Sequence, residues 1–294
     1  MSSLPPPPPA APPTGPPATD AHTCYRHPKR AAGRQCTRCG RFACSECLVQ
    51  ASVGSHCVDC ARASRPKAAT RARYWNARQP TLVTYTLIAI NLAVFVSGVA
   101  LDPQSLSGRR TTELHVDLAL NGELLSITHE WYRLVTSGFL HFGILHLGFN
   151  MYMLYLLGQM LEPVLGRVRF GLLYLAALLG GSLGVVVLDR GGLTAGASGA
   201  VFGLLGAAFV GQWLHGANPL STSIGSVLMM NLFITFAFRG QISVGGHVGG
   251  LIAGAICGAA MLAPRHKGVP AWASYVVPFV VAVAALGGAV AYVR

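Results

Sequence analysis

Charged side chains are scarce in this 294-residue chain, because Asp, Glu, Lys and Arg make up only 11% of it and ten residues in all are acidic. A soluble globular protein carries charge on about a quarter of its residues. Hydrophobic residues account for 52% of the chain. The shortage of charge excludes a soluble globular protein, and we expect most of the chain to lie in a lipid bilayer.

Cysteine and positive charge are unevenly distributed. Residues 1–80 hold seven of the eight cysteines and 12 of the 22 Lys and Arg residues, but only three of the ten acidic residues. Residues 1–20 are rich in proline, lack an apolar pattern and lack the charged start and apolar core of a signal peptide. We expect a disordered tail over 1–20, a Cys-rich module over 21–62, a basic juxtamembrane linker over 63–80 and a transmembrane domain over 81–294.

Long apolar runs follow residue 80. Most are close to the ~20 residues that a helix needs to cross a bilayer. They are uniformly apolar rather than alternating, which predicts helices and not the strands of a barrel. The fold class is therefore expected to be an all-α polytopic membrane protein with a small N-terminal domain. The seven predicted spans are 81–101, 144–161, 170–188, 198–215, 222–238, 244–263 and 272–293.

Basic residues flank these spans unequally. Ten Lys or Arg residues lie on the side of the Cys-rich module and six on the other side, three of them in a long loop. Basic loops tend to stay in the cytoplasm. We expect a multi-pass protein with a cytoplasmic N-terminus. The Ala, Gly, Pro and Arg content is typical of a GC-rich bacterium, so the membrane is expected to be a bacterial plasma membrane.

The Cys-rich module contains four pairs of Cys or His residues, each pair separated by two residues. This spacing lets both side chains of a pair reach one tetrahedral metal ion. Eight ligands would complete two zinc sites and leave no position for water, so the zinc would be structural. Disulfides are the alternative, but seven is an odd number and the module is expected in the reducing cytoplasm. The candidate ligands are Cys24, His27, Cys36, Cys39, Cys44, Cys47, Cys57 and Cys60.

The order of the four pairs resembles the B-box type of zinc finger. That resemblance implies that the first and third pairs share one ion and that the second and fourth pairs share the other. His56 is an alternative ligand. We expect the module to bind a protein partner or to regulate the membrane domain. A cytoplasmic position beside a membrane that contains anionic lipid explains the positive charge of the module, so no nucleic-acid partner is expected.

Polar residues stand at the beginnings of three apolar spans. His146 and Asn150 are four residues apart and share a helix face. Ser198 lies in a Gly-Ala-Ser-Gly segment, and His247 lies between two pairs of glycines. Ionisable groups within spans are costly and often functional. Because the second, fourth and sixth spans all begin on the outer side, we expect the three clusters to meet in one site.

Small residues one turn apart would let the spans that carry Ser198 and His247 approach closely. An imidazole in contact with a serine hydroxyl can take its proton and make it a nucleophile. Ser198 would stand at a helix N-terminus, where free N–H groups stabilise an oxyanion. His146 and Asn150 would add donors. The small residues are Gly199 and Gly203 in one span and Gly250 and Gly254 in the other.

With these motifs the chain resembles the rhomboid family of intramembrane serine proteases from about residue 81 to 263. The seventh span resembles the family variant with one additional C-terminal helix. The resemblance implies that Ser198 is the nucleophile, that His247 is the general base, and that His146, Asn150 and Gly196 lie on the oxyanion and substrate side. The supporting positions that it implies are Phe202, which stacks on the catalytic histidine, and His141, Arg133 and Glu162.

The resemblance also implies hydrolysis of peptide bonds in or near transmembrane segments by a Ser–His dyad, without a catalytic cofactor. The expected partners are transmembrane protein substrates and the lipid bilayer. The family's Trp-Arg pair reads Tyr132-Arg133 here, which affects loop packing rather than catalysis. An inactive rhomboid-like protein that binds membrane clients is one alternative, disfavoured by the intact Ser198 and His247. A metal-regulated transporter is another, disfavoured by spans whose interiors lack acidic residues.

Overall fold

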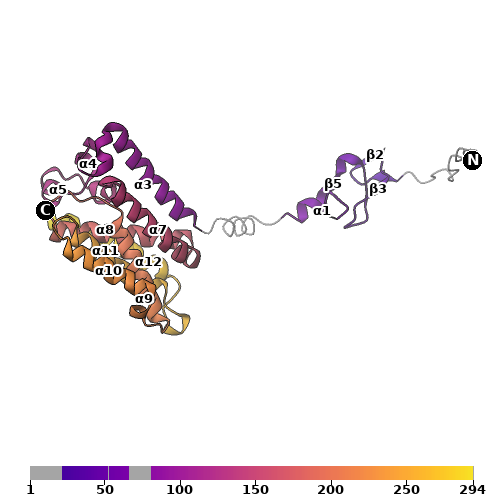
Figure 1. The fold of residues 1–294 in the computed structure, drawn as a ribbon. Helices are drawn as coiled ribbons and strands as arrows, with labels where there is room; N and C mark the ends of the chain where they lie inside the picture. The colour runs from indigo at the N-terminus through magenta and orange to yellow at the C-terminus, as the bar shows by residue number, and fades with distance from the viewer. Residues whose placement is uncertain (1–21, 52, 66–80, 294) are drawn as a thin grey trace, which may run out of the picture. The chain divides into compact units, whose positions relative to one another are not determined.

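The computed structural model describes residues 22–51, 53–65 and 81–293. The chain divides into two compact units, Met1–Asn76 and Ala77–Arg294 (Figure 1). The tail expected over 1–20 and most of the linker expected over 63–80 lie outside the described residues.

The N-terminal unit consists of three small antiparallel hairpins and one short helix. The hairpins pair β1 with β2, β3 with β4 and β5 with β6. The buried side chains of the unit are mostly cysteines, with small alanines between them. So few apolar side chains cannot stabilise a domain of this size unaided. The elements are β1 (Thr23–Cys24), β2 (His27–Ala31), β3 (Arg34–Gln35), β4 (Phe42–Ala43), η1 (Ser45–Cys47), β5 (Leu48–Gln50), β6 (Ser55–Cys57) and α1 (Val58–Ala63).

The second unit is a bundle of seven apolar helices at the positions of the seven predicted spans. Within the described residues, five helices are long and apolar enough to cross a membrane, and α9 and α10 are shorter, with 17 and 15 residues. A central helix such as α9, buried against its neighbours along most of its length, does not have to match the hydrocarbon thickness by itself. The helices are α3 (Leu82–Leu101), α7 (Gly143–Leu165), α8 (Arg167–Leu188), α9 (Ser198–Leu214), α10 (Ser223–Ala237), α11 (Val244–Met261) and α12 (Ala273–Val293).

Short helices fill the long connection between α3 and α7. They pack at one end of the bundle, beside the beginnings of α7 and α9 (Figure 1). Two further single turns occur after α9 and after α11. The short elements are η2 (Pro103–Ser107), α4 (Glu113–Leu118), α5 (Gly122–Thr128), α6 (Arg133–Thr136), η3 (Ser137–Phe139), η4 (Pro219–Ser221) and η5 (Arg265–Lys267).

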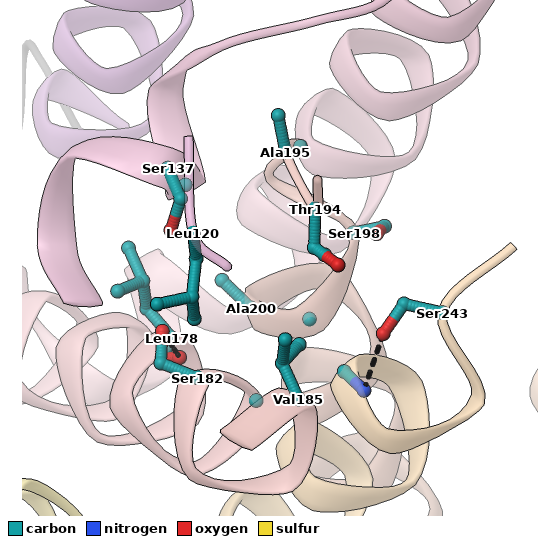
Figure 2. A pocket seen from close by; sticks show the side chains of 15 residues that line it. Leu120, Ser137, Leu178, Ser182, Val185, Thr194, Ala195, Ser198, Ala200 and Ser243 are labelled. Atoms are coloured by element: carbon teal, nitrogen blue, oxygen red, sulfur yellow. Dashed lines mark hydrogen bonds between the residues drawn. The ribbon is translucent and has the colours of Figure 1, made fainter. Parts of the chain in front are cut away.

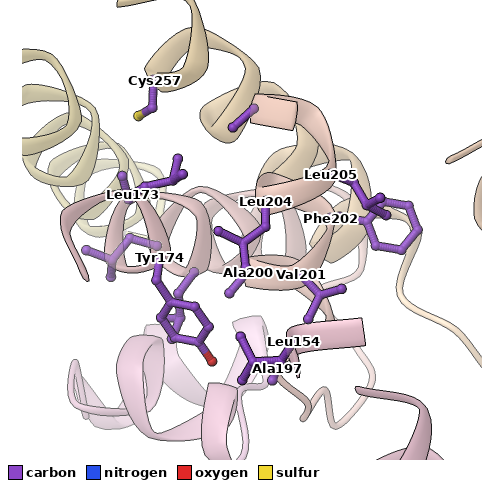
Figure 3. Close-up of a cluster of buried hydrophobic side chains, with 14 of the residues drawn as sticks. Leu154, Leu173, Tyr174, Ala197, Ala200, Val201, Phe202, Leu204, Leu205 and Cys257 are labelled. Carbon is purple, nitrogen blue, oxygen red and sulfur yellow. The ribbon is translucent and has the colours of Figure 1, made fainter. Parts of the chain in front are cut away.

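The hydrophobic core of the bundle surrounds α9. Leu204 and Leu205 of α9 are buried together with Leu154 of α7 and Leu173 of α8 (Figure 3). Cys257 of α11 is fully buried in the same cluster and packs as a small hydrophobic residue. The helix that begins with Ser198 is therefore held from three sides.

Glycines bring the backbones of α9 and α11 into direct contact. A Cβ atom added to Gly250 would collide with the backbone of Gly199, and one added to Gly254 would collide with the backbone of Gly203. These are the two small-residue faces expected from the sequence, and the structure confirms their contact. On another face of α11, Gly249 meets the backbone of α8 in the same way.

Glu162 joins the end of α7 to the beginning of α3. Its carboxylate is fully buried and accepts hydrogen bonds from the backbone N–H groups of Val83 and Thr84 and from the Thr84 hydroxyl, at 2.7–2.8 Å. A carboxylate at a helix N-terminus satisfies free N–H groups and interacts favourably with the helix dipole. Glu162 lies about 18 Å along α7 from Asn150, at ~1.5 Å per residue.

We expect Gly254→Ala to destabilise the bundle by roughly 1–3 kcal/mol, because the added methyl group overpacks the contact with α9. Thermal unfolding of the purified protein in detergent measures the effect. Gly287→Ala on α12 is the matched control, since a Cβ there meets nothing within 4 Å. Equal melting temperatures for the two variants would contradict this account of the packing.

Candidate functional site

The loop before α9 is anchored to the neighbouring segments by its backbone. Thr194 and Leu120 exchange backbone hydrogen bonds at 2.7 and 2.9 Å, and the Gly196 N–H donates to the Ser137 carbonyl at 2.9 Å. Gly196 has a φ of 136°, in a region that favours glycine. This conformation turns the chain into α9, so that Ser198 is the first residue of the helix.

His141 is fully buried between this loop and the connection that precedes α7. Its Nε2 atom accepts a hydrogen bond from the Ala197 N–H at 3.4 Å, and its carbonyl accepts one from Nε2 of His115 at 3.1 Å. These contacts hold the residue that immediately precedes Ser198.

His247 lies in the first turns of α11, with its side chain 8% exposed. Its ring stacks on the ring of Phe202, with the centroids 4.0 Å apart and the planes at 17°. Phe202 follows Ser198 by one helical turn. The stacking that the family resemblance implied for Phe202 is therefore present in the structure.

Ser198 and His247 lie on the facing surfaces of α9 and α11. A Cβ atom on Gly199, next to Ser198, would stand 3.1 Å from the carbonyl oxygen of Gly246, next to His247. Among the described residues, however, no hydrogen bond joins the two side chains, so the contact expected from the sequence is not formed in this state. Hydrogen bonds between catalytic groups are often long in the free enzyme and shorten when substrate binds.

His146 of α7 lies next to Gly196, in the loop that leads into Ser198. Its Nδ1 atom accepts a hydrogen bond from the Phe142 N–H at 3.3 Å, so the ring proton resides on Nε2. A Cβ atom on Gly196 would lie 2.8 Å from His146 Nε2 and 3.6 Å from Ser198 Oγ. The absence of a side chain at Gly196 therefore leaves the space between an N–H donor and the serine hydroxyl open.

Asn150 is one turn further along α7 and is 6% exposed. Its side-chain amide donates to the His146 carbonyl at 3.0 Å. One of its two amide hydrogens is therefore engaged by its own helix, and an amide nitrogen carries a second hydrogen that can be donated.

Arg133 is buried at the start of α6 and organises the connection between α3 and α7. Its guanidinium donates to the carbonyls of Val116 and Ala119 at 2.6 and 3.0 Å and pairs with Glu130 at 2.6 Å. The hydrogen bond from Arg133 lowers the pKa of Glu130. The arginine of the Tyr132-Arg133 pair thus ties together the segments that follow α3.

A cavity of about 30 Å³ lies beside Ser198 (Figure 2). Hydroxyl groups of Ser137, Ser182 and Ser243 line it together with Ser198, and Ser243 accepts a hydrogen bond from the Gly246 N–H at 2.9 Å. A polar cavity needs only about 10–15 Å³ to hold a water molecule. The site therefore has room for water next to the serine.

The nearest acidic side chain in this region serves α11 rather than His247. Asp189 accepts hydrogen bonds from the Ser243 hydroxyl at 2.6 Å and from the Gly245 N–H at 2.7 Å. The partner of His247 is Thr235 of α10, whose hydroxyl lies 2.7 Å from His247 Nδ1. The sequence analysis missed Thr235, because a single threonine in an apolar span gives no sign of which helix it faces.

The eight candidate metal ligands form two separate clusters. One joins the first and third pairs and the other joins the second and fourth pairs, which is the arrangement that the B-box resemblance implied. In each cluster the donor atoms all lie within 4.8 Å of one another, and His56 belongs to neither. The clusters are Cys24, His27, Cys44 and Cys47, and Cys36, Cys39, Cys57 and Cys60.

The spacing of these donor atoms fits a tetrahedral zinc ion. Cys and His ligands at about 2.3 and 2.0 Å from such an ion lie about 3.5–3.8 Å apart. Nδ1 of His27 lies 3.4, 3.5 and 3.9 Å from the sulfur atoms of Cys47, Cys44 and Cys24. In the other cluster, the sulfur atoms of Cys39 and Cys57 are 3.8 Å apart. The eight cysteines are free thiols rather than disulfides.

The fold and the residues gathered at the beginnings of α7, α9 and α11 define an all-α polytopic membrane protein with a small N-terminal domain. Residues 128–264 match the family model described as the rhomboid domain. Together with the similar proteins described next, this match supports the rhomboid family.

Three curated proteins illustrate the similarity. Rhomboid protease GluP of Bacillus subtilis is 34% identical over 203 residues, which are 67% of this chain and 38% of that protein. RHOMBOID-like protein 1 of Arabidopsis thaliana is 33% identical over 173 residues, 57% of this chain and 44% of that protein. Rhomboid-type serine protease 2 of Emericella nidulans is 34% identical over 134 residues, 44% of this chain and 26% of that protein. The chain thus matches less than half the length of each of these relatives.

We expect Gly196→Ala to suppress the reactivity of Ser198, because the added methyl group would collide with the His146 ring and strain the backbone. The rate at which a fluorophosphonate probe labels Ser198 measures this reactivity. Gly192→Ala in the same loop is the control, since its Cβ meets nothing within 4 Å. Labelling of Gly196→Ala at the rate of the control would show that the open space is unimportant.

Proposed function

We propose that this protein is an intramembrane serine endopeptidase that hydrolyses peptide bonds in or near the transmembrane segments of other membrane proteins. The observation that supports this most directly is that Ser198, His247 and His146 come near one another from three helices, and that Ser198 also lines a small cavity. Two similar proteins bear names that state a rhomboid or serine protease.

In the proposed reaction, the Ser198 hydroxyl attacks the scissile carbonyl while Nε2 of His247 takes its proton. The new Ser–acyl bond forms as the peptide C–N bond breaks, and the histidine returns the proton to the leaving amine. A water molecule then attacks the acyl carbonyl and gives a proton to His247. The bond between Ser198 Oγ and the acyl carbon breaks, the carboxylate leaves, and His247 returns the proton to Ser198 Oγ. Phe202 supports the imidazole throughout by stacking on it.

The oxyanion would be stabilised from two directions. Ser198 stands at the N-terminus of α9, where backbone N–H groups lack intrahelical partners. Nε2–H of His146 points into the space beside Gly196, and the free amide hydrogen of Asn150 is on the same face of α7. The carbonyl oxygen of the substrate would therefore lie between α7 and the beginning of α9.

The proposed topology follows the distribution of basic residues. The N-terminus and the Cys-rich module over 21–62 would lie in the cytoplasm, and the site would lie near the outer face of a plasma membrane. Substrates would then reach the site from the bilayer. The catalytically inactive, client-binding alternative has the same topology and differs only in the reactivity of Ser198.

We expect Ser198→Ala to abolish cleavage of a single-span test protein in proteoliposomes, because the nucleophile is lost. His247→Ala should reduce the rate by on the order of 10²–10⁴-fold, the usual contribution of a general base. Ser226→Ala, on the exposed face of α10, should cleave like the wild type. Undiminished cleavage by Ser198→Ala would rule out the dyad, and an inactive wild type would favour the client-binding alternative.

For the N-terminal unit, we propose two structural zinc ions, one in each cluster. The donor sets of three thiols with an imidazole and of four thiols suit zinc, and all four positions around each ion would be filled by protein. The small core of this unit makes metal binding a major source of its folding free energy. The unit would then serve as a rigid surface for a protein partner.

We expect the purified full-length protein to contain about two zinc ions per chain, the number that two complete four-ligand clusters hold. Cys36→Ser should lower the content to about one, because it removes a ligand from one cluster only. Cys257→Ala is the control, since Cys257 lies in α11 outside both clusters. Elemental analysis gives the ratio, and a metal-free protein with a folded N-terminal unit would disprove the proposal.

A further inference from the structure

Thr235 carries a buried hydroxyl group in a part of α10 that is otherwise exposed. Its side chain is 1% exposed, whereas its neighbours Ile234 and Phe236 are 38% and 54% exposed. The hydroxyl makes two close contacts. It lies 2.7 Å from the carbonyl oxygen of Asn231, one turn earlier, and 2.7 Å from Nδ1 of His247 on α11.

Counting protons determines the direction of both hydrogen bonds. A threonine hydroxyl has one hydrogen to donate, and a carbonyl oxygen can only accept. Both contacts can therefore be hydrogen bonds together only if Thr235 donates to Asn231 and Nδ1–H of His247 donates to Thr235. Nε2 of His247 is then unprotonated.

This tautomer is the one that a general base requires. An imidazole that donates through Nδ1 presents a lone pair at Nε2, which can take a proton from a serine hydroxyl. The reverse tautomer would present an N–H at Nε2 and could not accept that proton. Asp189, the acidic residue nearby, is occupied by Ser243 and Gly245 at the start of α11.

We propose that Thr235 is a positioning residue for catalysis, which accepts Nδ1–H of His247 and thereby sets the tautomer and the ring orientation of the base. The inference rests on the proposed function of Ser198 and His247. Thr235 does not touch substrate; it takes the place that a carboxylate occupies in a Ser-His-Asp triad. Stacking on Phe202 sets the plane of the ring, and Thr235 sets which edge faces α9.

The test compares Thr235→Val, which keeps the shape but loses the hydroxyl, with Thr235→Ser, which keeps the hydroxyl. With the full-length protein in proteoliposomes and a single-span test protein, Thr235→Val should lower kcat by about 10–100-fold, the range found when a group that orients a metal-bound histidine is removed. KM should change little, and Thr235→Ser should restore most of kcat. Thr86→Val is the matched control, because Thr86 bonds the carbonyl one turn earlier in α3 and is exposed.

A second measurement does not depend on cleavage. Solid-state ¹⁵N NMR of histidine-labelled protein, with His247 identified by comparison with His247→Ala, reports which ring nitrogen carries the proton. We expect Nδ1–H in the wild type and a mixture of tautomers in Thr235→Val. A wild type with the proton on Nε2, or a Thr235→Val variant with the wild-type kcat, would overturn the inference.

Failure of the proposed function would look different. In that case Ser198→Ala would cleave the test protein like the wild type, or the wild type would not cleave it at all. The tautomer of His247 would still decide whether Thr235 orients the imidazole. If Thr235→Val does not fold, the tautomer of His247 in the wild type and the kcat of Thr235→Ser still test whether Thr235 orients the imidazole.

Discussion

The contact between the glycine backbones of α9 and α11 is the constraint on which the site depends. Ser198 and His247 are on different helices, and they face each other only because Gly199 and Gly203 lie against Gly250 and Gly254. Side chains at these positions would push the helices apart by several ångströms. In lipid, where apolar side chains gain little from helix association, this close packing also contributes to the stability of the bundle.

Most buried polar side chains of the bundle form hydrogen bonds that hold one helix or loop to another. Glu162 accepts three hydrogen bonds at the start of α3, Arg133 holds the carbonyls of the long connection, and Asp189 caps α11. The Ser198 hydroxyl, in contrast, forms no hydrogen bond with His247 in this state. A buried polar group is costly unless it is paired; among the described residues of the bundle, the buried side-chain atoms without a partner are Asn91 Oδ1, His141 Nδ1 and the Tyr174 hydroxyl.

The N-terminal unit lacks the hydrophobic core that stabilises the bundle. It has too few apolar side chains for a core, and its buried positions are occupied by cysteines. Under the proposed zinc binding, coordination by the two clusters of four donors would take the place of hydrophobic packing. The cross-braced pairing brings together residues that are far apart in the sequence. For example, Nδ1 of His27 lies near the sulfur atoms of Cys24, Cys44 and Cys47.

The sequence by itself determined the class of fold, the seven apolar helices, the eight clustered Cys and His residues and the polar residues at the helix beginnings, because hydropathy, Cys and His spacing and helical periodicity are local properties. It also predicted the glycine faces and the stacking of Phe202 on His247. Only the tertiary structure decided that Asp189 accepts hydrogen bonds at the start of α11 and that Thr235 is the partner of His247. These depend on which side chains meet across helices distant in the sequence, and a local pattern carries no information about the rotation of one helix against another.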